Sequence, residues 1–181
     1  MNTPVYDFLI QYAERDPVRL HMPGHKGRFG APALQRATTL DLTEITGADS
    51  LFEAEGILAE SERNAASLYG TAYTFYSCGG STLCIQTMLL LMKQQGRAVL
   101  AARNVHRAFL NTCVLLDLPV QWIYPRESDG ILSGTYDLAD FEAALQQQTR
   151  PACVYVTSPD YLGRMADIAG LAELCHRYHA K

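Results

Sequence analysis

The sequence predicts an α/β fold with a largely parallel sheet, preceded by an N-terminal arm that is part helix and part extended chain. Three observations support this prediction. From residue 53 onward, short apolar runs alternate with amphipathic segments of about ten or more residues, a pattern typical of β-α-β units. Hydrophobic residues make up 48% of the 181 residues and charged residues 19%, which allows a sizeable core. Prolines and glycines crowd residues 16–32 and separate a short first helix from the regular part.

The N-terminal arm is assigned to residues 1–52. A helix is predicted over residues 3–14, because Thr3 can cap it, Pro4 suits its first turn, and apolar residues recur at helical spacing. Residues 16–32 are predicted to form an extended loop. A loop of this length without structure of its own usually carries function or lies on a partner.

Residues 53–181 are predicted to form the N-terminal part of a larger α/β domain. Helices are expected at residues 53–68, 81–93, 106–116, 138–147 and 168–178. Strands are expected at residues 72–77, 98–102, 120–124 and 152–157. The last predicted helix ends close to Lys181, where the alternating pattern requires another strand, so the expected architecture is truncated.

Composition argues against several classes of function. The formal net charge is −4 and basic residues are scattered, which gives no electrostatic reason to expect binding to nucleic acid or to an anionic membrane surface. The apolar runs are far too short to span a bilayer, and acidic residues interrupt the first of them, so no signal peptide is expected. Five cysteines without a C-x-x-C pair are typical of reduced thiols in a cytoplasmic protein.

Ligands of open α/β sheets bind beyond the carboxyl ends of the parallel strands, and the first such end carries a glycine turn. The turn consists of Gly79, Gly80, Ser81 and Thr82. Two glycines allow close approach of the backbone, and two hydroxyls stand at a helix N-terminus with its free N–H groups. This combination suits a phosphate, although the lysine of a Walker P-loop is absent. The alternative is an ordinary glycine turn followed by a serine cap.

Two further strand ends carry polar side chains. His106 follows the predicted strand 98–102, where an imidazole could stack on a planar ligand ring or transfer protons. The alternative is that His106 caps the following helix. Ser158 belongs to a Thr-Ser-Pro turn after the strand 152–157, and its hydroxyl could reach the same crevice or serve the turn alone.

Metal binding and thiol catalysis are not expected. His21 and His25 are separated by three residues in a Pro-Gly loop rather than on a helix face, and no acidic or cysteine partner lies nearby in the sequence. Cys78 stands beside the glycine turn and could act as a nucleophile with His106 as its base. The sequence supplies no third residue to orient that base, so this remains the weaker alternative.

The motifs acquire more weight from their order along the chain. They are Leu20-His21-Met22-Pro23-Gly24-His25-Lys26-Gly27, Asp41-Leu42-Thr43-Glu44, Ala65-Ala66-Ser67-Leu68-Tyr69-Gly70, Gly80-Ser81-Thr82, Arg103-Asn104-Val105-His106 and Thr157-Ser158-Pro159. This succession resembles the ornithine/lysine/arginine decarboxylase family of fold-type-I enzymes that depend on pyridoxal 5'-phosphate (PLP). The resemblance runs from about Leu20 to the end of the chain. Each motif alone is weak, but their order and spacing are specific.

The resemblance implies a fold, a cofactor and partners. The fold would be the three-layer α/β/α sandwich of PLP-dependent aminotransferases. Gly79, Gly80, Ser81 and Thr82 would bind the cofactor phosphate, His106 would stack over the pyridine ring as a catalytic residue, and Ser158 would lie close to the cofactor. The substrate would be a small amino acid with a basic side chain. The family works as homodimers or larger homo-oligomers, and the arm of residues 21–27 is a candidate to reach the subunit interface.

This sequence also departs from the family pattern. Arg107 and Ala108 stand where lysine and serine are usual. Asp160, Tyr161 and Leu162 stand where threonine and two tyrosines are usual. PLP chemistry needs a Schiff-base lysine and an acid beside the pyridine nitrogen, and in the family both lie beyond the position of Lys181. We therefore expect this chain to be inactive alone. The alternatives are a non-catalytic paralogue or binding module that pairs with a complete subunit, and a different fold-type-I enzyme such as an aminotransferase or a lyase.

Overall fold

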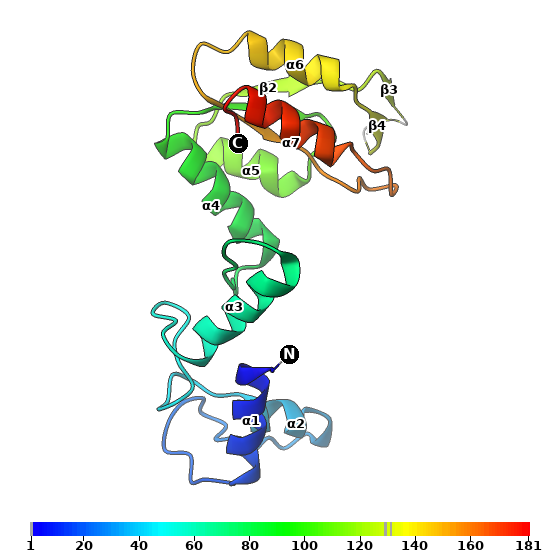
Figure 1. The fold of residues 1–181 in the computed structure, drawn as a ribbon. Helices are drawn as coiled ribbons and strands as arrows, with labels where there is room; N and C mark the ends of the chain where they lie inside the picture. The colour runs from blue at the N-terminus through cyan, green and yellow to red at the C-terminus, as the bar shows by residue number, and fades with distance from the viewer. Residues whose placement is uncertain (1, 129, 131) are drawn as a thin grey trace. The chain divides into compact units, whose positions relative to one another are not determined.

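The chain divides into two compact units, Met1–Tyr76 and Ser77–Lys181, in a computed structural model that describes residues 2–128, 130 and 132–181 (Figure 1). The sequence placed a boundary at residues 52/53 instead. The difference arises from the helix that follows residue 56, because it packs on the N-terminal helix and thereby belongs to the first unit.

The unit Met1–Tyr76 is helical. Its described residues form α1 (Pro4–Glu14), α2 (Pro32–Leu40) and α3 (Ile57–Tyr69). The predicted first helix is confirmed, whereas α2 was not predicted. Pro32 is compatible with the start of α2, because the first N–H groups of a helix have no partner within it and the missing N–H of proline costs no hydrogen bond there. The side-chain amide of Asn64 in α3 donates to Asn2 Oδ1 (2.8 Å), which ties α3 to the start of α1.

A single carboxylate determines where α3 begins. The sequence predicted the start at residue 53, but the helix starts at Ile57. Asp49 lies before it with a φ of 67° and accepts backbone hydrogen bonds from the loop and from the first turn of α3. The donors are the N–H groups of Ser50 (2.9 Å), Glu55 (3.2 Å), Gly56 (2.9 Å) and Leu58 (2.9 Å). Asp49 therefore caps α3 although it is not adjacent to the helix in the sequence, and its hydrogen bonds keep residues 50–56 in a non-helical conformation.

The unit Ser77–Lys181 is built on a parallel sheet. Its strands are β1 (Ala98–Ala102), β2 (Val120–Ile123) and β5 (Ala152–Tyr155), in the order β2-β1-β5. These are three of the four predicted strands. A short antiparallel pair, β3 (Glu127–Ser128) and β4 (Gly134–Thr135), was not predicted.

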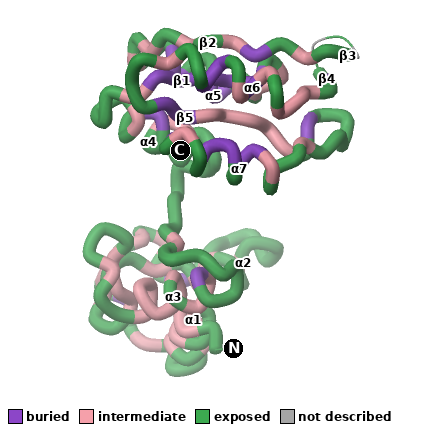
Figure 2. The backbone as a smooth tube through the Cα atoms, turned by 45° about the horizontal axis from the view of Figure 1, so that its top comes forward, coloured by how far each residue is buried: buried purple, intermediate pink, exposed green. Residues whose placement is uncertain are grey.

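Helices cover both faces of this sheet. They are α4 (Gly80–Gln94), α5 (Arg107–Leu115), α6 (Leu138–Gln146) and α7 (Ile168–Arg177). Because successive side chains of a strand point to opposite faces, Val99 and Ala101 pack with α4 and α5, whereas Leu100 and Ala102 pack with α6 and α7. Figure 2 shows the buried positions of this unit concentrated along the strands and the helix faces beside them. The predicted α/β class and three-layer arrangement are confirmed in this unit.

The strand predicted at residues 72–77 is wrong. The structure has no strand there, and Tyr73 and Phe75 are 78% and 79% exposed. Their rings stack on each other with centroids 6.3 Å apart, and the Tyr76 N–H donates to the Glu62 carboxylate (2.8 Å) rather than to a neighbouring strand. The alternation of aromatic and polar residues resembled a strand, but no sheet edge among the described residues receives it.

After α7 the chain returns to the sheet. The Lys181 N–H donates to the carbonyl of Ala152 (3.1 Å), and the Val154 N–H donates to the carbonyl of Lys181 (2.8 Å). This pattern is a parallel bridge on the edge of β5 that faces away from β1. No helix among the described residues is long and apolar enough to cross a bilayer.

Replacing Asp49 by alanine is expected to loosen the start of α3, because four N–H groups lose their acceptor. Partial desolvation raises the pKa of the Asp49 carboxyl, but the four backbone hydrogen bonds outweigh it and leave the pKa below the usual value. The stabilisation is therefore present above the unfolded-state pKa of about 3.9 and is lost as the pH falls through the lower folded-state pKa.

Amide hydrogen exchange of residues 55–58 measures this effect. Protection in Asp49→Ala should fall below that of the parent chain near pH 7, and the difference should shrink near pH 3. Glu14→Ala, which removes an exposed carboxylate from α1 in the same unit, serves as the control. Equal protection in all three proteins near neutral pH would contradict the capping role.

Candidate functional site

His106 and Ser158 lie in the loops that follow β1 and β5, at the carboxyl edge of the parallel sheet, whereas no strand among the described residues precedes the glycine turn. The glycine turn stands at the start of α4, and His106 stands at the start of α5, which packs against α4 on the same face. His106 and the turn after β5 border one hollow of about 400 Å³, together with Asn104, Pro159 and Tyr161. Residues 79–82 are not among those that line this hollow.

The glycine turn presents backbone donors rather than a side-chain cap. Gly80 has a φ of 63°, a left-handed conformation that favours glycine. A Cβ on Gly79 would lie 2.6 Å from the Cβ of Leu83, so position 79 requires a glycine for lack of space. Among the described residues, the N–H groups of Gly80, Ser81 and Thr82 have no hydrogen-bond partner, and no side chain caps the helix. The positive end of the α4 dipole is therefore open to an anion.

His106 caps α5, as the alternative interpretation expected. Its Nδ1 accepts the backbone N–H of Ala108 at 3.1 Å, and the residue has the extended backbone of an N-cap. Because Nδ1 is the acceptor, the proton of the neutral ring is on Nε2. The cap fixes the orientation of the imidazole, which is exposed to solvent. Capping leaves the ring faces free, so it is compatible with stacking on a planar ligand.

Ser158 has a local partner. Its Oγ accepts the N–H of Ala166 at 3.0 Å and closes the loop between β5 and α7. The neighbouring Thr157 differs, because its Oγ1 is buried without a hydrogen-bond partner. Asn104, at the end of β1, also has a buried and unpartnered side-chain oxygen, Oδ1. The loops after β1 and β5, at the carboxyl edge of the sheet, thus each contain a buried side-chain oxygen that makes no hydrogen bond.

A buried polar network beside this edge was not predicted from the sequence. Asp160 is 7% exposed, and its carboxylate accepts the Ser133 hydroxyl and the N–H groups of Leu162 (3.0 Å) and Arg164 (2.9 Å). The hydrogen bond from Ser133 lowers the pKa of Asp160 despite its burial. The unusual Asp160 therefore shapes the loop after β5. The only sequence signal for it was its departure from the family pattern.

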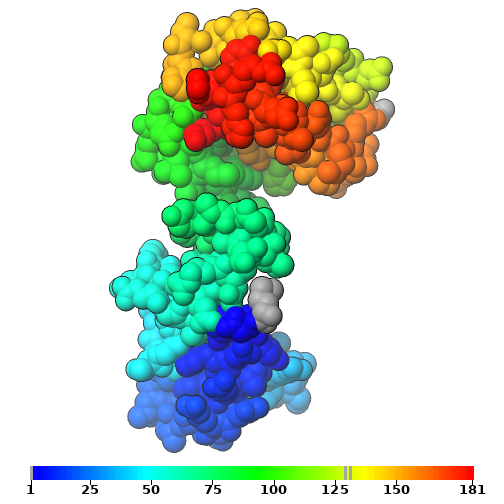
Figure 3. Space-filling model, in the orientation of Figure 1, coloured from blue at the N-terminus to red at the C-terminus, as the bar shows by residue number. Residues whose placement is uncertain are grey.

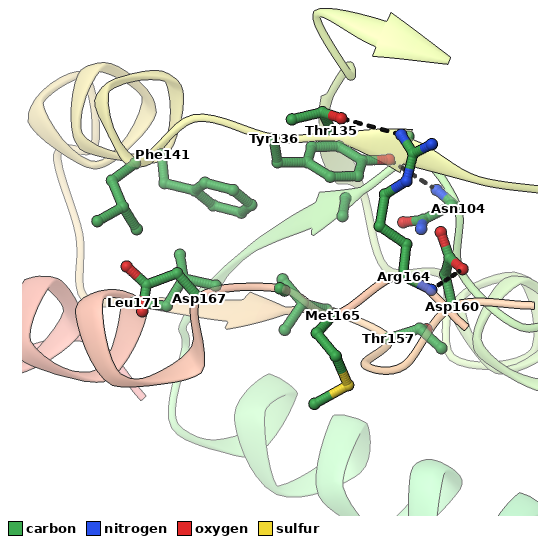
Figure 4. A pocket seen from close by; sticks show the side chains of 15 residues that line it. Asn104, Thr135, Tyr136, Phe141, Thr157, Asp160, Arg164, Met165, Asp167 and Leu171 are labelled. Atoms are coloured by element: carbon green, nitrogen blue, oxygen red, sulfur yellow. Dashed lines mark hydrogen bonds between the residues drawn. The ribbon is translucent and has the colours of Figure 1, made fainter. Parts of the chain in front are cut away.

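Tyr136 lines the same cavity as Asp160 and bonds the end of β1. Its hydroxyl accepts the backbone N–H of Asn104 at 3.1 Å, and burial raises the pKa of the phenol. Figure 4 shows Tyr136, Asn104, Asp160 and Thr157 around one cavity. In Figure 3 the segments around α7, drawn in orange and red, lie on the near face of this unit.

The histidines of the N-terminal arm do not converge on a common ligand. The Tyr12 hydroxyl and His21 Nε2 are hydrogen bonded at 2.6 Å, whereas His25 bonds the Asp41 carboxylate at 3.1 Å. The Lys26 ammonium donates to the carbonyl of His21. Cys78 is exposed and makes no hydrogen bond to a histidine among the described residues.

Comparison with known proteins connects this site to a family. A family model described as "Orn/Lys/Arg decarboxylase, major domain" matches residues 3–181. Curated arginine decarboxylases of Halalkalibacterium halodurans and Bacillus subtilis are each 30% identical to the chain, over 96% and 97% of its length. The chain spans 37% of the length of both relatives.

The fold comparison agrees. The solved structure of lysine decarboxylase A from Pseudomonas aeruginosa superposes with a TM-score of 0.66 and 22% identity, over 87% of this chain and 24% of that one. At this identity the likeness shows the fold alone, whereas the family model covers nearly all of the sequence. The chain belongs to the Orn/Lys/Arg decarboxylase family and corresponds to an N-terminal portion of its major domain.

Proposed function

We propose that this chain is the N-terminal part of a PLP-dependent decarboxylase that acts on a basic amino acid. Family membership and the open anion site at the start of α4 together support this function. When bound, PLP withdraws electrons from the substrate so that the carboxylate can leave as carbon dioxide. Arginine, lysine and ornithine are the substrates named for the similar proteins, and any of the three would satisfy the proposal.

The glycine turn fits the phosphate of this cofactor. Three unpartnered N–H groups and the hydroxyls of Ser81 and Thr82 supply donors, and a phosphate oxygen accepts hydrogen bonds without needing a proton. The lack of any side chain on Gly79 and Gly80 lets the anion approach the backbone. Binding is expected to be weak in the chain alone, because a single helix terminus contributes only part of the affinity for a cofactor.

His106 would hold the cofactor ring in position. The cap to Ala108 fixes the imidazole before any ligand arrives, so stacking would require no further ordering of the side chain. The Nε2–H stays available as a donor. Ser158 would contribute through the shape of the loop after β5, since its hydroxyl already accepts the Ala166 N–H.

The remaining catalytic groups are not at the strand ends of this chain. Its three lysines are Lys26, Lys93 and Lys181. Lys26 and Lys93 donate to backbone carbonyls, and Lys181 lies at the edge of β5 rather than beyond its carboxyl end. We therefore propose that the chain is inactive unless a lysine from elsewhere completes the site. Pairing with further copies of the chain, as a homodimer or larger assembly, belongs to the same proposal.

Inorganic phosphate is expected to bind the chain weakly and to contact residues 79–82. Phosphate titration followed by amide chemical shifts should perturb Gly80, Ser81 and Thr82 first. Gly80→Ala strains a left-handed position and should weaken the effect several-fold, whereas Gly96→Ala, at a left-handed glycine that follows the end of α4, should not. Shifts that avoid residues 79–82 would contradict the cofactor assignment.

No lysine of this chain is expected to form a stoichiometric covalent adduct with PLP. After incubation with PLP and borohydride reduction, peptide mass spectrometry should find only partial labelling spread over the three lysines. The reason is that none of the three stands in a loop that follows the carboxyl end of a strand, where fold-type-I cofactors are held. Complete labelling of Lys26 with no label elsewhere would overturn this prediction.

Two substitutions separate the capping and stacking roles of His106. His106→Ala should lower the free energy of unfolding by about 1 kcal/mol, because Ala108 loses its acceptor. His106→Asn should restore most of that loss, since asparagine is a good N-cap, but it should still bind PLP more weakly because the ring is gone. Denaturant unfolding and PLP absorbance titration measure the two effects. Equal PLP affinity in the parent chain and in His106→Asn would remove the stacking role.

A further inference from the structure

A cavity of about 250 Å³ lies on the α6/α7 side of the sheet, next to the carboxyl ends of β1 and β5. Its two ends differ. Figure 4 places Phe141 and Leu171 at one end and Asn104, Thr157 and Asp160 at the other. Helices α6 and α7 supply the apolar end, and the loops after the two strands supply the polar end.

The polar end contains two hydrogen-bonding atoms that the protein leaves unused. Asn104 Oδ1 and Thr157 Oγ1 are buried and have no partner. A buried polar atom without a hydrogen bond costs about 1–3 kcal/mol, and native structures hold few of them. The neighbouring groups do not relieve them, because Tyr136 bonds the Asn104 N–H and Asp160 bonds Ser133 and two backbone N–H groups.

The lining favours a ligand that donates hydrogen bonds and carries positive charge. Asn104 Oδ1 can only accept, and the Thr157 hydroxyl can accept as well. The Asp160 carboxylate lies at the polar end, whereas the Asp167 carboxylate lies beside Leu171 at the other end and accepts the Gly170 N–H (2.9 Å). One guanidinium, that of Arg164, also lines the cavity, and it donates to Thr135 Oγ1 (2.9 Å). An anion would meet a carboxylate and carbonyl-type oxygens here, whereas an ammonium would satisfy them.

We propose that this cavity binds a small organic cation: a primary ammonium on a short aliphatic chain. The ammonium lies at Asn104 and Thr157, and the chain lies against Phe141 and Leu171. The volume is below the roughly 300–1,000 Å³ of pockets for drug-sized ligands, so only a small molecule fits. This site needs neither PLP nor a lysine, and it stands apart from the phosphate donors at Gly80, so it goes beyond the proposed function.

Calorimetric titration of the full chain with n-butylammonium chloride tests the proposal. Binding should be saturable with one site per chain. Two probes separate charge from hydrogen bonding: 1-pentanol has a similar length without the charge, and tetramethylammonium has the charge without an N–H donor. Both should bind at least about tenfold more weakly, since each loses a charge-assisted hydrogen bond. Equal binding of 1-pentanol would show that the cavity is a merely apolar pocket and would overturn the proposal.

Two matched valine substitutions link the binding to the unpartnered hydroxyl. Thr157→Val should weaken n-butylammonium about tenfold yet leave the thermal midpoint unchanged or higher, because no protein hydrogen bond is lost. Thr112→Val removes a buried hydroxyl that donates to the Ala108 carbonyl (2.7 Å), so it should lower the midpoint and leave the affinity unchanged. Equal affinities in Thr157→Val and the parent chain, or no saturable binding at all, would refute the site. Phosphate shifts at residues 79–82 report separately on the proposed function.

Discussion

Burial of the central strand β1 on both faces organises the unit Ser77–Lys181. Every residue from Ala98 to Ala102 is buried, and Leu100 is fully inaccessible to solvent. A strand of small and branched apolar residues with helices on both sides is typical of a sheet whose strands run parallel and whose connections pass over the faces. The same constraint brings the loops after β1 and β5 to one edge, and so the candidate site follows from the packing of a five-residue strand.

The sequence predicted this unit well because its signals are local and strong. Apolar runs bounded by helices identified β1, β2 and β5, and the helices between them lie within a few residues of the predicted bounds. The failures have physical causes. Residues 72–77 alternate like a strand but lack a neighbour to pair with, and α3 starts late because Asp49 holds the preceding loop. Neither a missing partner strand nor a capping bond from seven residues away can be read from periodicity.

The candidate site was likewise predicted only in part. Glycines and hydroxyls before a helix indicated the anion turn, and a histidine after a strand indicated the start of α5. The contact of Asp160 with Ser133 could not be foreseen, because the two residues lie 27 positions apart in the sequence. For His106 the two interpretations weighed at the outset prove compatible, since a ring whose Nδ1 caps a helix still has two open faces.

The two glycines of the anion turn constrain evolution differently. Gly80 is restricted by its backbone angle, so asparagine, which tolerates left-handed conformations, is the mildest replacement whatever surrounds it. Gly79 is restricted by its neighbour, because any Cβ meets the Leu83 side chain. Because the clash includes the Cβ of Leu83, glycine at position 83 would make room for alanine at position 79. Positions 79 and 83 are therefore expected to vary together among relatives, while position 80 varies alone.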